Sequence, residues 1–575
     1  MADEIKLSDQ QPQTPGVRNV DSITQVPIET CPDTTRNIIS TAKPDDEEVI
    51  ASVPEEVEYP TGIRFAILTV SLMLMVFMVA LDTTIMSTAI PAITTQFHSI
   101  PDIGCYSGAY LLPVMALQPS FGKIYTFFSI KYVMLCALLL FETGSLVSAL
   151  SPNSPVFILG RVVSGIGGAG IFGGGMILIQ LAVPLRRIAL YLSVMSSMYG
   201  AAGLTGPPVG GVFTSSARLT WRFCFYINLP FGGISVLLML FAFREPKREK
   251  MKLSVEEKFK KMDVIGTTLF ISSMVCLFLA LQWGGNSIPW SNSTAWGLML
   301  GFGLLLIAFV VLQFHLHENA TIPPRVFSDR SVVLAQLIAI LLSIGTNTHT
   351  FYLAFYFQSA KGLSASASGI RSLPYLLSVT FTELFVGAGV SWTGWYNPFM
   401  IVGTAIYVIG CGLLCTLQVD TGAGHIIGYQ ILAGIGFGST LALCATVVRV
   451  NVRDEHIPVA GALASFAPSF GGTLAASIGQ NVFRRSLVDK LLQSVSPELT
   501  AQIVDAGARG GVDVVADYQK GLVLDAYNHA VKKTFLVSAI VSGVAFVCTL
   551  GLRWKKIKKK APVAQSVDAP QSRAI

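Results

Sequence analysis

Charged residues are scarce in this sequence. Asp, Glu, Lys and Arg make up only 13% of its 575 residues, whereas 52% are hydrophobic and the mean hydropathy is +0.60. A soluble protein carries about 25% charged residues, so the composition excludes an ordinary water-soluble fold. The 52 glycines and 28 prolines are dispersed without a period, which excludes a collagen-like chain. We therefore predict an all-α membrane protein that crosses the bilayer several times.

Motifs for nucleotide, metal or covalent chemistry are also missing. The sequence contains no G-x-x-x-x-G-K-[ST], no G-x-S-x-G and no H-E-x-x-H. Its nine cysteines fall mostly inside apolar runs and lack the paired spacing of a zinc site. We therefore expect no enzyme, no ATP-driven motor and neither cofactor nor metal. The basic stretch near the carboxyl end lacks interleaved aromatics, so it suits an anionic bilayer surface better than nucleic acid.

Apolar runs long enough to cross a bilayer recur along the chain. A hydrocarbon core about 30 Å thick needs roughly 20 apolar residues per helix. The least regular run is the second, Cys105–Gly122, because Pro113 and Pro119 interrupt it. We predict fourteen spans, which begin near residues 64, 104, 132, 156, 189, 223, 264, 295, 331, 369, 399, 425, 458 and 534.

Lys and Arg gather in alternate loops, as the positive-inside rule requires. With a cytoplasmic amino terminus, the inner loop 244–261 alone holds eight of them, whereas the short outer loops together hold four. We therefore predict that both termini are cytoplasmic, in the plasma membrane or alternatively the vacuolar membrane. The sequon at Asn292 then falls in an outer loop, where a glycan can be attached.

An internal repeat divides the chain. GRVVSGIGGAG at Gly160–Gly170 has a weak echo in GYQILAGIGFG at Gly428–Gly438, and PPVGG at Pro207–Gly211 has one in PSFGG at Pro468–Gly472. Two six-helix halves separated by two inserted helices explain both offsets, and repeated halves around a midplane site are common in secondary transporters. The predicted parts are a disordered cytoplasmic tail (1–62), an N-terminal six-helix bundle (63–243), a cytoplasmic basic loop (244–262), two inserted helices (263–316), a C-terminal six-helix bundle (331–553) with a long outer loop (483–533), and a basic cytoplasmic tail (554–575).

Four ionisable residues fall inside predicted spans, where such residues are costly and commonly functional. A rise of 1.5 Å per residue places Asp82, Glu142 and Arg161 in the outer half of the first bundle. Arg161 can there stabilise one or both carboxylates while a proton or a cationic substrate comes and goes; a static ion pair is the alternative. Glu383 falls near mid-depth in the tenth span, either as a proton-exchanging group or as a buried structural carboxyl.

The fifth span contains an unusual density of glycine and proline. GLTGPPVGG places small residues at Gly203, Gly206, Gly210 and Gly211 and removes backbone donors at Pro207 and its neighbour. Such a helix packs closely and bends, so we predict a hinge there rather than ordinary small-residue packing.

At these residues the chain resembles the major facilitator superfamily, and specifically its fourteen-helix drug:proton antiporters of the fungal toxin and multidrug branch. The resemblance is carried by LDTTIMSTAIP (81–91), R-x-x-x-G-x-G (161–167), GLTGPPVGG (203–211) and WRFCFYINLPFGG (221–233). It implies a major facilitator fold and proton-driven export of small amphipathic organic compounds by alternating access. It further implies that Asp82 and Arg161 take part in coupling, and that Gly206, Pro207 and Gly210 of the fifth span impose the export direction.

One loop departs from the family pattern. The connection between spans two and three usually reads G-x-L-a-D-r-x-G-r-[KR], whereas here it is GKIYTFFSIK (Gly122–Lys131). Thr126 stands where the Asp is expected and Phe127 where the Arg is expected. We therefore expect the inner gate to rely on packing at Gly122 and on Lys123 and Lys131.

Two other functions fit a transporter scaffold. One is a proton-coupled importer of a nutrient or iron chelate, against which the fifth-span motif argues. The other is a non-transporting receptor, against which the lack of a large signalling domain argues. The expected partners are a small-molecule substrate, protons and the lipid bilayer, with no nucleic acid and a monomeric state.

Overall fold

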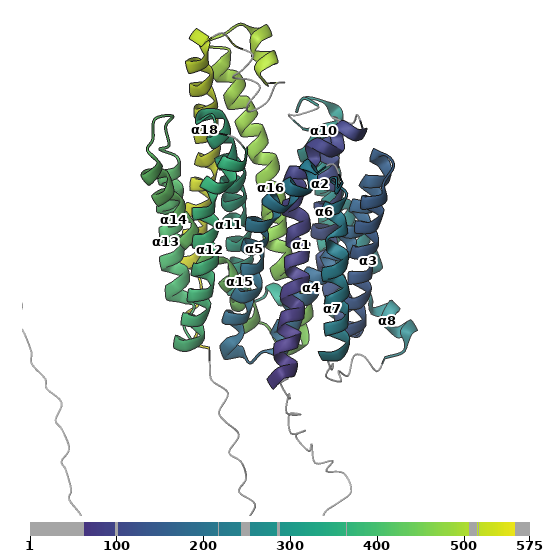
Figure 1. Ribbon diagram of the computed structural model, residues 1–575. Coiled ribbons are helices and arrows are strands. Elements are labelled where there is room, and N and C mark those ends of the chain that lie inside the picture. The colour runs from purple at the N-terminus through teal and green to yellow at the C-terminus, as the bar shows by residue number, and fades with distance from the viewer. Residues whose placement is uncertain are drawn as a thin grey trace, which may run out of the picture. The chain divides into compact units, whose positions relative to one another are not determined.

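The chain folds into a set of long helices that run side by side (Figure 1). Thirteen helical segments in the described residues are long and apolar enough to cross a membrane. A further helix, α2 (Ile103–Phe127), contains Pro113 and Pro119 and has a comparable length, so fourteen membrane helices are accounted for. Of the predicted parts, most of 1–62, the start of the basic loop and residues after 557 lie outside the described residues. The computed structural model describes residues 62–97, 102–216, 218–242, 253–284, 288–363, 365–504, 515 and 517–557.

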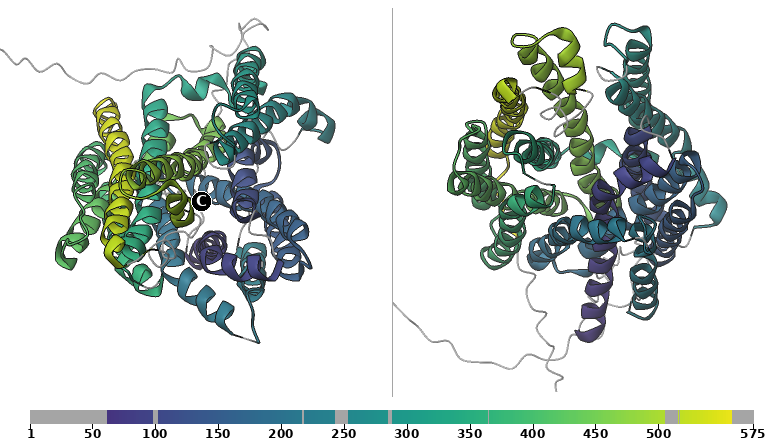
Figure 2. Two further views of the ribbon diagram at one scale, coloured as in Figure 1. Left: turned by 90° about the horizontal axis from the view of Figure 1, so that it is seen from above. Right: turned by 45° about the horizontal axis from the view of Figure 1, so that its top comes forward.

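The helices form two bundles and an inserted hairpin. Seen from above, the helices of the first half gather on one side and most of those after residue 330 on the other (Figure 2). The first bundle consists of α1 (Gly62–Phe97), α2, α3 (Ile130–Leu150), α4 (Ser154–Ala182), α5 (Ile188–Ser215) and the broken sixth span α6 (Phe223–Tyr226) and α7 (Asn228–Ala242). The short α8 (Val255–Lys261) precedes the inserted hairpin of α9 (Val264–Trp283) and α10 (Ser293–Leu316). The second bundle consists of α11 (Arg330–Phe355), α12 (Ala365–Thr393), α13 (Asn397–Leu414), the broken span α14 (Ala423–Gly438) and α15 (Leu441–Asn451), α16 (Ile457–Leu491) and α18 (Asp517–Leu550).

Helix pairs of the first bundle recur in the second, in agreement with the repeat in the sequence. α4 packs against α2 and α3, and α14 packs against α12 and α13. Likewise α5 packs against α1, and α16 packs against α11. Glycines make these approaches close: a side chain at Gly167 would overlap the backbone of Phe141, and one at Gly436 would overlap the backbone of Tyr407.

The two ends of the described chain lie at the same end of the helices, which we call the basal end. α1 starts beside α5, since the rings of Phe65 and Tyr191 lie 5.1 Å apart. Arg186, in the short η2 (Leu185–Arg187) that precedes α5, donates a hydrogen bond of 3.0 Å to the carbonyl oxygen of Ile557. The opposite end of the helices is called the upper end.

Helices occupy much of the predicted outer loop 483–533. α16 continues to Leu491 and α18 begins at Asp517, and both project beyond their neighbours at the upper end (Figure 1). The reason is a buried apolar stripe: Phe483, Leu487 and Leu491 recur every four residues and pack in one core with Tyr527. Hydropathy alone misses this extension because charged residues alternate with the stripe. The connection between the two helices is therefore shorter than the sequence suggests.

The basic loop before the inserted hairpin contains a capped helix. Ser254 and Glu257 form a capping box at the start of α8, in which each side chain accepts a hydrogen bond from the other residue's backbone N–H. The hydrogen bond from the Ser254 backbone holds the pKa of the Glu257 carboxyl below its usual value. The predicted loop 244–262 is thus helical over Val255–Lys261.

Asp263 fixes the basal end of the inserted hairpin. One carboxylate oxygen caps α9 by accepting from the Gly266 N–H at 2.6 Å. The other accepts from Gln313 Nε2 at 2.8 Å and from the backbone N–H of Thr321 at 3.1 Å. Asp263 is only 6% exposed. If its carboxylate is removed, water therefore cannot take its place as the acceptor for these donors.

Asp263→Ala is expected to destabilise the protein by about 2 kcal/mol, since it removes a helix cap and leaves buried donors unpaired. The measurement is the melting temperature of the detergent-purified protein, which we expect to fall by more than about 2 °C. Asp489→Ala serves as the control because Asp489 is 64% exposed and forms only a surface ion pair with Arg485. Equal melting temperatures for the two variants would contradict the assignment.

Candidate functional site

A fully buried ion pair lies in the first bundle. Arg161 on α4 donates from Nη1 to Oδ2 of Asp82 on α1 at 2.6 Å, and the two side chains are 1% and 0% exposed. The sequence places both residues in the outer half of this bundle, and the structure brings them into direct contact. A buried ion pair is costly to form, and its value commonly lies in specificity or switching rather than in stability.

A set of neutral polar groups holds this pair in place. Asn228, at the start of α7, donates to Asp82 Oδ1 at 3.2 Å and to the Ser145 hydroxyl at 3.1 Å. Arg161 Nε donates to the backbone carbonyl of Tyr106 at 3.3 Å. The pair is therefore held from α2, α3 and α7 as well as from its own two helices. Sequence reasoning missed these supporting residues, because neutral polar side chains in a span carry no charge that marks them as functional.

Aromatic rings cover the guanidinium group of Arg161. Its Cζ atom lies 4.4 Å from the ring centroid of Tyr110 and 5.7 Å from that of Phe225. Cation–π attraction stabilises the charge without an additional anion. The guanidinium group of Arg161 therefore has stabilising contacts besides its ion pair with Asp82.

Glu142 does not join the ion pair. Both carboxylate oxygens are buried, and neither has a hydrogen-bond partner in the part of the chain that the structure describes. The side chain lies against α7 at Gly232, where any larger residue would overlap it. The predicted three-residue network is thus a pair with a separate, unpartnered carboxyl group nearby on α3.

Glu383 lies in the contact between the two bundles. It is 3% exposed on α12, and no hydrogen bond or ion pair joins its carboxyl group to another described residue. Its neighbours one turn away contact α5, since a side chain at Gly200 would overlap Thr380 and one at Gly387 would meet Ser193. Glu383 therefore occupies the face of α12 that the two bundles share.

The glycines of the fifth span separate into two groups. A side chain at Gly206 would overlap the Thr84 hydroxyl, and one at Gly210 would overlap the Thr88 hydroxyl and lie 2.7 Å from Ile85 Cγ1. These two glycines thus let α5 approach α1 in the segment that carries Asp82. By contrast, Gly203 faces Leu376 of α12 at ordinary contact distance, and Gly211 faces open space. Pro207 and Pro208 lie between the close-contact positions within a continuous α5.

The predicted gating loop contributes differently at its three positions. A side chain at Gly122 would lie 2.7 Å from Ala462 Cβ and 3.1 Å from the Pro458 carbonyl oxygen on α16, so this glycine joins the two bundles at the basal end. Lys123 donates to the Ala320 carbonyl at 2.6 Å, which ties α2 to the connection after the inserted hairpin. Lys131 donates to the Leu240 carbonyl at 2.8 Å, within the first bundle.

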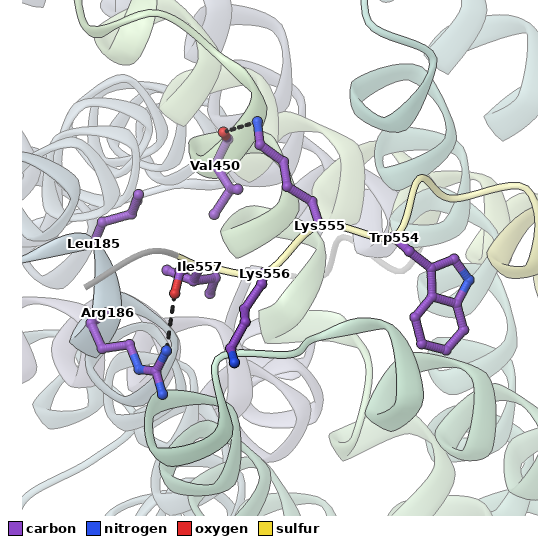
Figure 3. A pocket seen from close by; sticks show the side chains of 7 residues that line it. All are labelled: Leu185, Arg186, Val450, Trp554, Lys555, Lys556 and Ile557. Carbon is purple, nitrogen blue, oxygen red and sulfur yellow. Dashed lines mark hydrogen bonds between the residues drawn. The ribbon is translucent and has the colours of Figure 1, made fainter. Parts of the chain in front are cut away.

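Two arginines that the sequence did not single out also cross between the bundles at the basal end. Arg186 donates from Nε to the Ser391 carbonyl at 2.8 Å, and Arg449 on α15 donates to the Gln180 carbonyl on α4 at 3.4 Å. A hollow of about 900 Å³ adjoins them, lined by η2, α15 and residues 554–557 (Figure 3). The described contacts therefore join the two bundles at the basal end.

Asn292 caps the inserted helix α10 at the upper end. Its side-chain oxygen accepts from the Thr294 N–H at 2.8 Å. Two residues earlier, Trp290 donates to Asn481 of α16 at 3.3 Å, so the sequon lies where the hairpin meets the second bundle.

The fold and the site together define a multi-pass membrane protein with a buried charge pair inside its first bundle. The sequence profile of the Major Facilitator Superfamily matches residues 72–476, and the chain belongs to this superfamily. It is 40% identical over 506 residues to the efflux pump hmp6 of Hypomyces subiculosus, covering 87% of this chain and 89% of the relative. It is 38% identical to the efflux pump aflT of Aspergillus parasiticus, with 89% and 99% covered.

Solved structures share the fold at low sequence identity. The human organic anion transporter MFSD10 (TETRAN) matches with a TM-score of 0.56 at 12% identity, over 85% of this chain and 100% of that one. The proton:xylose symporter XylE matches with the same TM-score at 13% identity, over 86% and 97%. The predicted major facilitator fold is therefore confirmed. Membership of the superfamily and the relatives named efflux pumps show that the protein is a transporter.

Proposed function

We propose that the protein is a proton-coupled exporter of small amphipathic organic compounds such as toxins, secondary metabolites or drugs. The observation that carries the proposal is the buried Asp82–Arg161 pair, placed beside the close contact of α1 with Gly206 and Gly210 of α5. A carboxylate that can lose its counter-ion on protonation supplies a chemical switch, and the adjacent helix contact transmits a change in α1 to α5. The relatives named efflux pumps support the direction of transport.

In the proposed cycle, uptake of a proton by Asp82 neutralises the carboxylate and releases Arg161 Nη1. Arg161 keeps its bond to the Tyr106 carbonyl and its contact with the Tyr110 ring. Release of the proton restores the pair. The pair thus gives two discrete arrangements, which an alternating-access transporter couples to opening on one side or the other. Glu142 and Glu383 are proposed as additional proton-carrying groups, because neither has a counter-ion among the described residues.

The basal end is proposed to face the cytoplasm, with both termini on that side and the protein in the plasma membrane as a monomer. The structure then corresponds to the state closed toward the cytoplasm. The arrangement also leaves Asn292 on the outer face, where we propose that it carries a glycan.

The test is transport by the purified protein in inside-out vesicles with an imposed pH gradient. We expect a fluorescent amphipathic dye such as rhodamine 6G, or a member of a panel of neutral amphipathic compounds, to accumulate in a vesicle whose lumen is acidic. A protonophore should abolish the accumulation. Flux that ignores the gradient, or proton-driven movement of compounds in the opposite direction, would refute the exporter and favour an importer.

A further inference from the structure

The basal end is closed by an element that the family resemblance does not supply. The loop 122–131 lacks the Asp and Arg that usually form the charge relay there. The segment after the last membrane helix, Arg553–Ile557, crosses this end instead. We call it the basal strap.

The basal strap is tied to the second bundle at several points along its length. The Arg553 carbonyl accepts from the Tyr396 hydroxyl at 3.1 Å, and its guanidinium lies 3.3 Å from the Asp329 carboxylate. Lys555 Nζ donates to the Val450 carbonyl at 3.0 Å (Figure 3). At the far end, Ile557 is 1% exposed, so the strap ends in a buried anchor.

Arg186 ties the first bundle to this strap. Its Nη1 donates to the Ile557 carbonyl at 3.0 Å (Figure 3), while Nε and Nη2 donate to the carbonyls of Ser391 and Trp392 at the end of α12. One guanidinium group thus binds three main-chain carbonyls on two separate segments. The planar fork of an arginine suits such a cluster, whereas a lysine ammonium does not.

Gly394 makes room for the guanidinium. Its φ of +81° lies in the left-handed region, and any side chain there would overlap Arg186 Nη1. The same residue accepts a hydrogen bond of 2.9 Å from the Ile557 N–H. Gly394 therefore leaves space for the arginine and binds the end of the strap.

We infer that Arg186, Gly394 and the basal strap form a latch that holds the basal end of the transporter closed, in place of the missing charge relay. The inference deepens the proposed function, because it names the gate of the same alternating-access cycle. Opening of the basal end requires Arg186 to leave its three carbonyls together, so the latch contributes to the equilibrium between the closed and open states.

The first test measures a distance rather than transport. Spin labels at the exposed positions Pro184 and Arg453, in a functional cysteine-free background, report the separation of the two bundles at the basal end. We expect Arg186→Gln at least to double the fraction of the long-distance population. Arg187→Gln is the matched control, since Arg187 carries the same charge, is exposed, and has a side chain that forms no hydrogen bond or ion pair with another described residue.

The second test removes the strap. Truncation after Leu552 deletes it, whereas truncation after Ile557 leaves it in place. We expect the shorter chain to show the same increase in the long-distance population as Arg186→Gln. Introducing Arg186→Gln into the shorter chain should increase that population by less than it does in the full chain. Size-exclusion profiles of all variants establish that they remain folded.

Two results would overturn the latch: a distance distribution for Arg186→Gln identical to that of Arg187→Gln, or identical distributions for the two truncations. A shifted distribution in a protein that moves no compound against a proton gradient would instead uphold the latch and refute the proposed export.

Discussion

Asp82→Asn is expected to reduce proton-driven efflux at least about tenfold while the protein remains in the membrane. The substitution keeps the size of the side chain and its contact with Asn228, but it removes the negative charge that Arg161 binds at 2.6 Å. Removing one partner of a buried pair leaves the other charge uncompensated, at a cost of about 3–5 kcal/mol. The measurement is dye accumulation in vesicles across a fixed pH gradient, normalised to the amount of protein.

A second variant separates loss of coupling from loss of folding. Asp82→Asn combined with Arg161→Gln removes both charges, so it should recover melting temperature relative to the single variant without recovering proton-driven efflux. Asp489→Asn, at an exposed position, is the control for removing a carboxylate. Efflux by Asp82→Asn at the level of this control would remove Asp82 from the coupling mechanism.

Gly206→Val and Gly210→Val are expected to reduce efflux about tenfold, with a smaller loss of stability. Each added side chain would overlap a hydroxyl of α1, at Thr84 or Thr88, so α5 must move away from the helix that carries Asp82. Overpacking of this kind typically costs about 1–3 kcal/mol. The measurement is again efflux per folded protein, taken with the melting temperature.

Gly211→Val supplies the matched control for this series. It places the same β-branched residue in the same helix, one position from Gly210, but no atom lies within 4 Å of the added Cβ. We expect this variant to retain efflux close to that of the unmodified chain. Equal losses at Gly206, Gly210 and Gly211 would show that valine acts through helix propensity and not through the contact with α1.

The sequence predicts the fold well because its signals are strong and local. Apolar runs of bilayer length predict the fourteen helices. The two short sequence repeats predict that α4 and α14 pack against equivalent neighbours in the two bundles. The spacing of Leu487, Leu491 and Leu492 predicts a short amphipathic element in the outer loop, but it does not predict that this helix is a continuation of α16. Packing against a helix that follows much later in the chain decides such a case.

The site is predicted where charge, or an unusual density of glycine and proline, marks it. Asp82 and Arg161 stand out because ionised groups in lipid are rare, and the helical rise is enough to place them at one depth. Asn228 and Ser145, which hold the pair, are ordinary polar residues without such a mark. Arg186 and Arg449 look like any other loop arginines, because their partners are backbone carbonyls that no sequence motif reveals.

The use of main-chain acceptors by Arg186 and Arg449 has a genetic consequence. A carbonyl is present whatever the side chain, so exchanging Ser391, Trp392 or Gln180 for another residue leaves the acceptor in place. Mutations that alter transport by acting on the basal end should therefore cluster at the donating arginines and at Gly394, whose backbone leaves space for a guanidinium group. Their partners should tolerate wide variation.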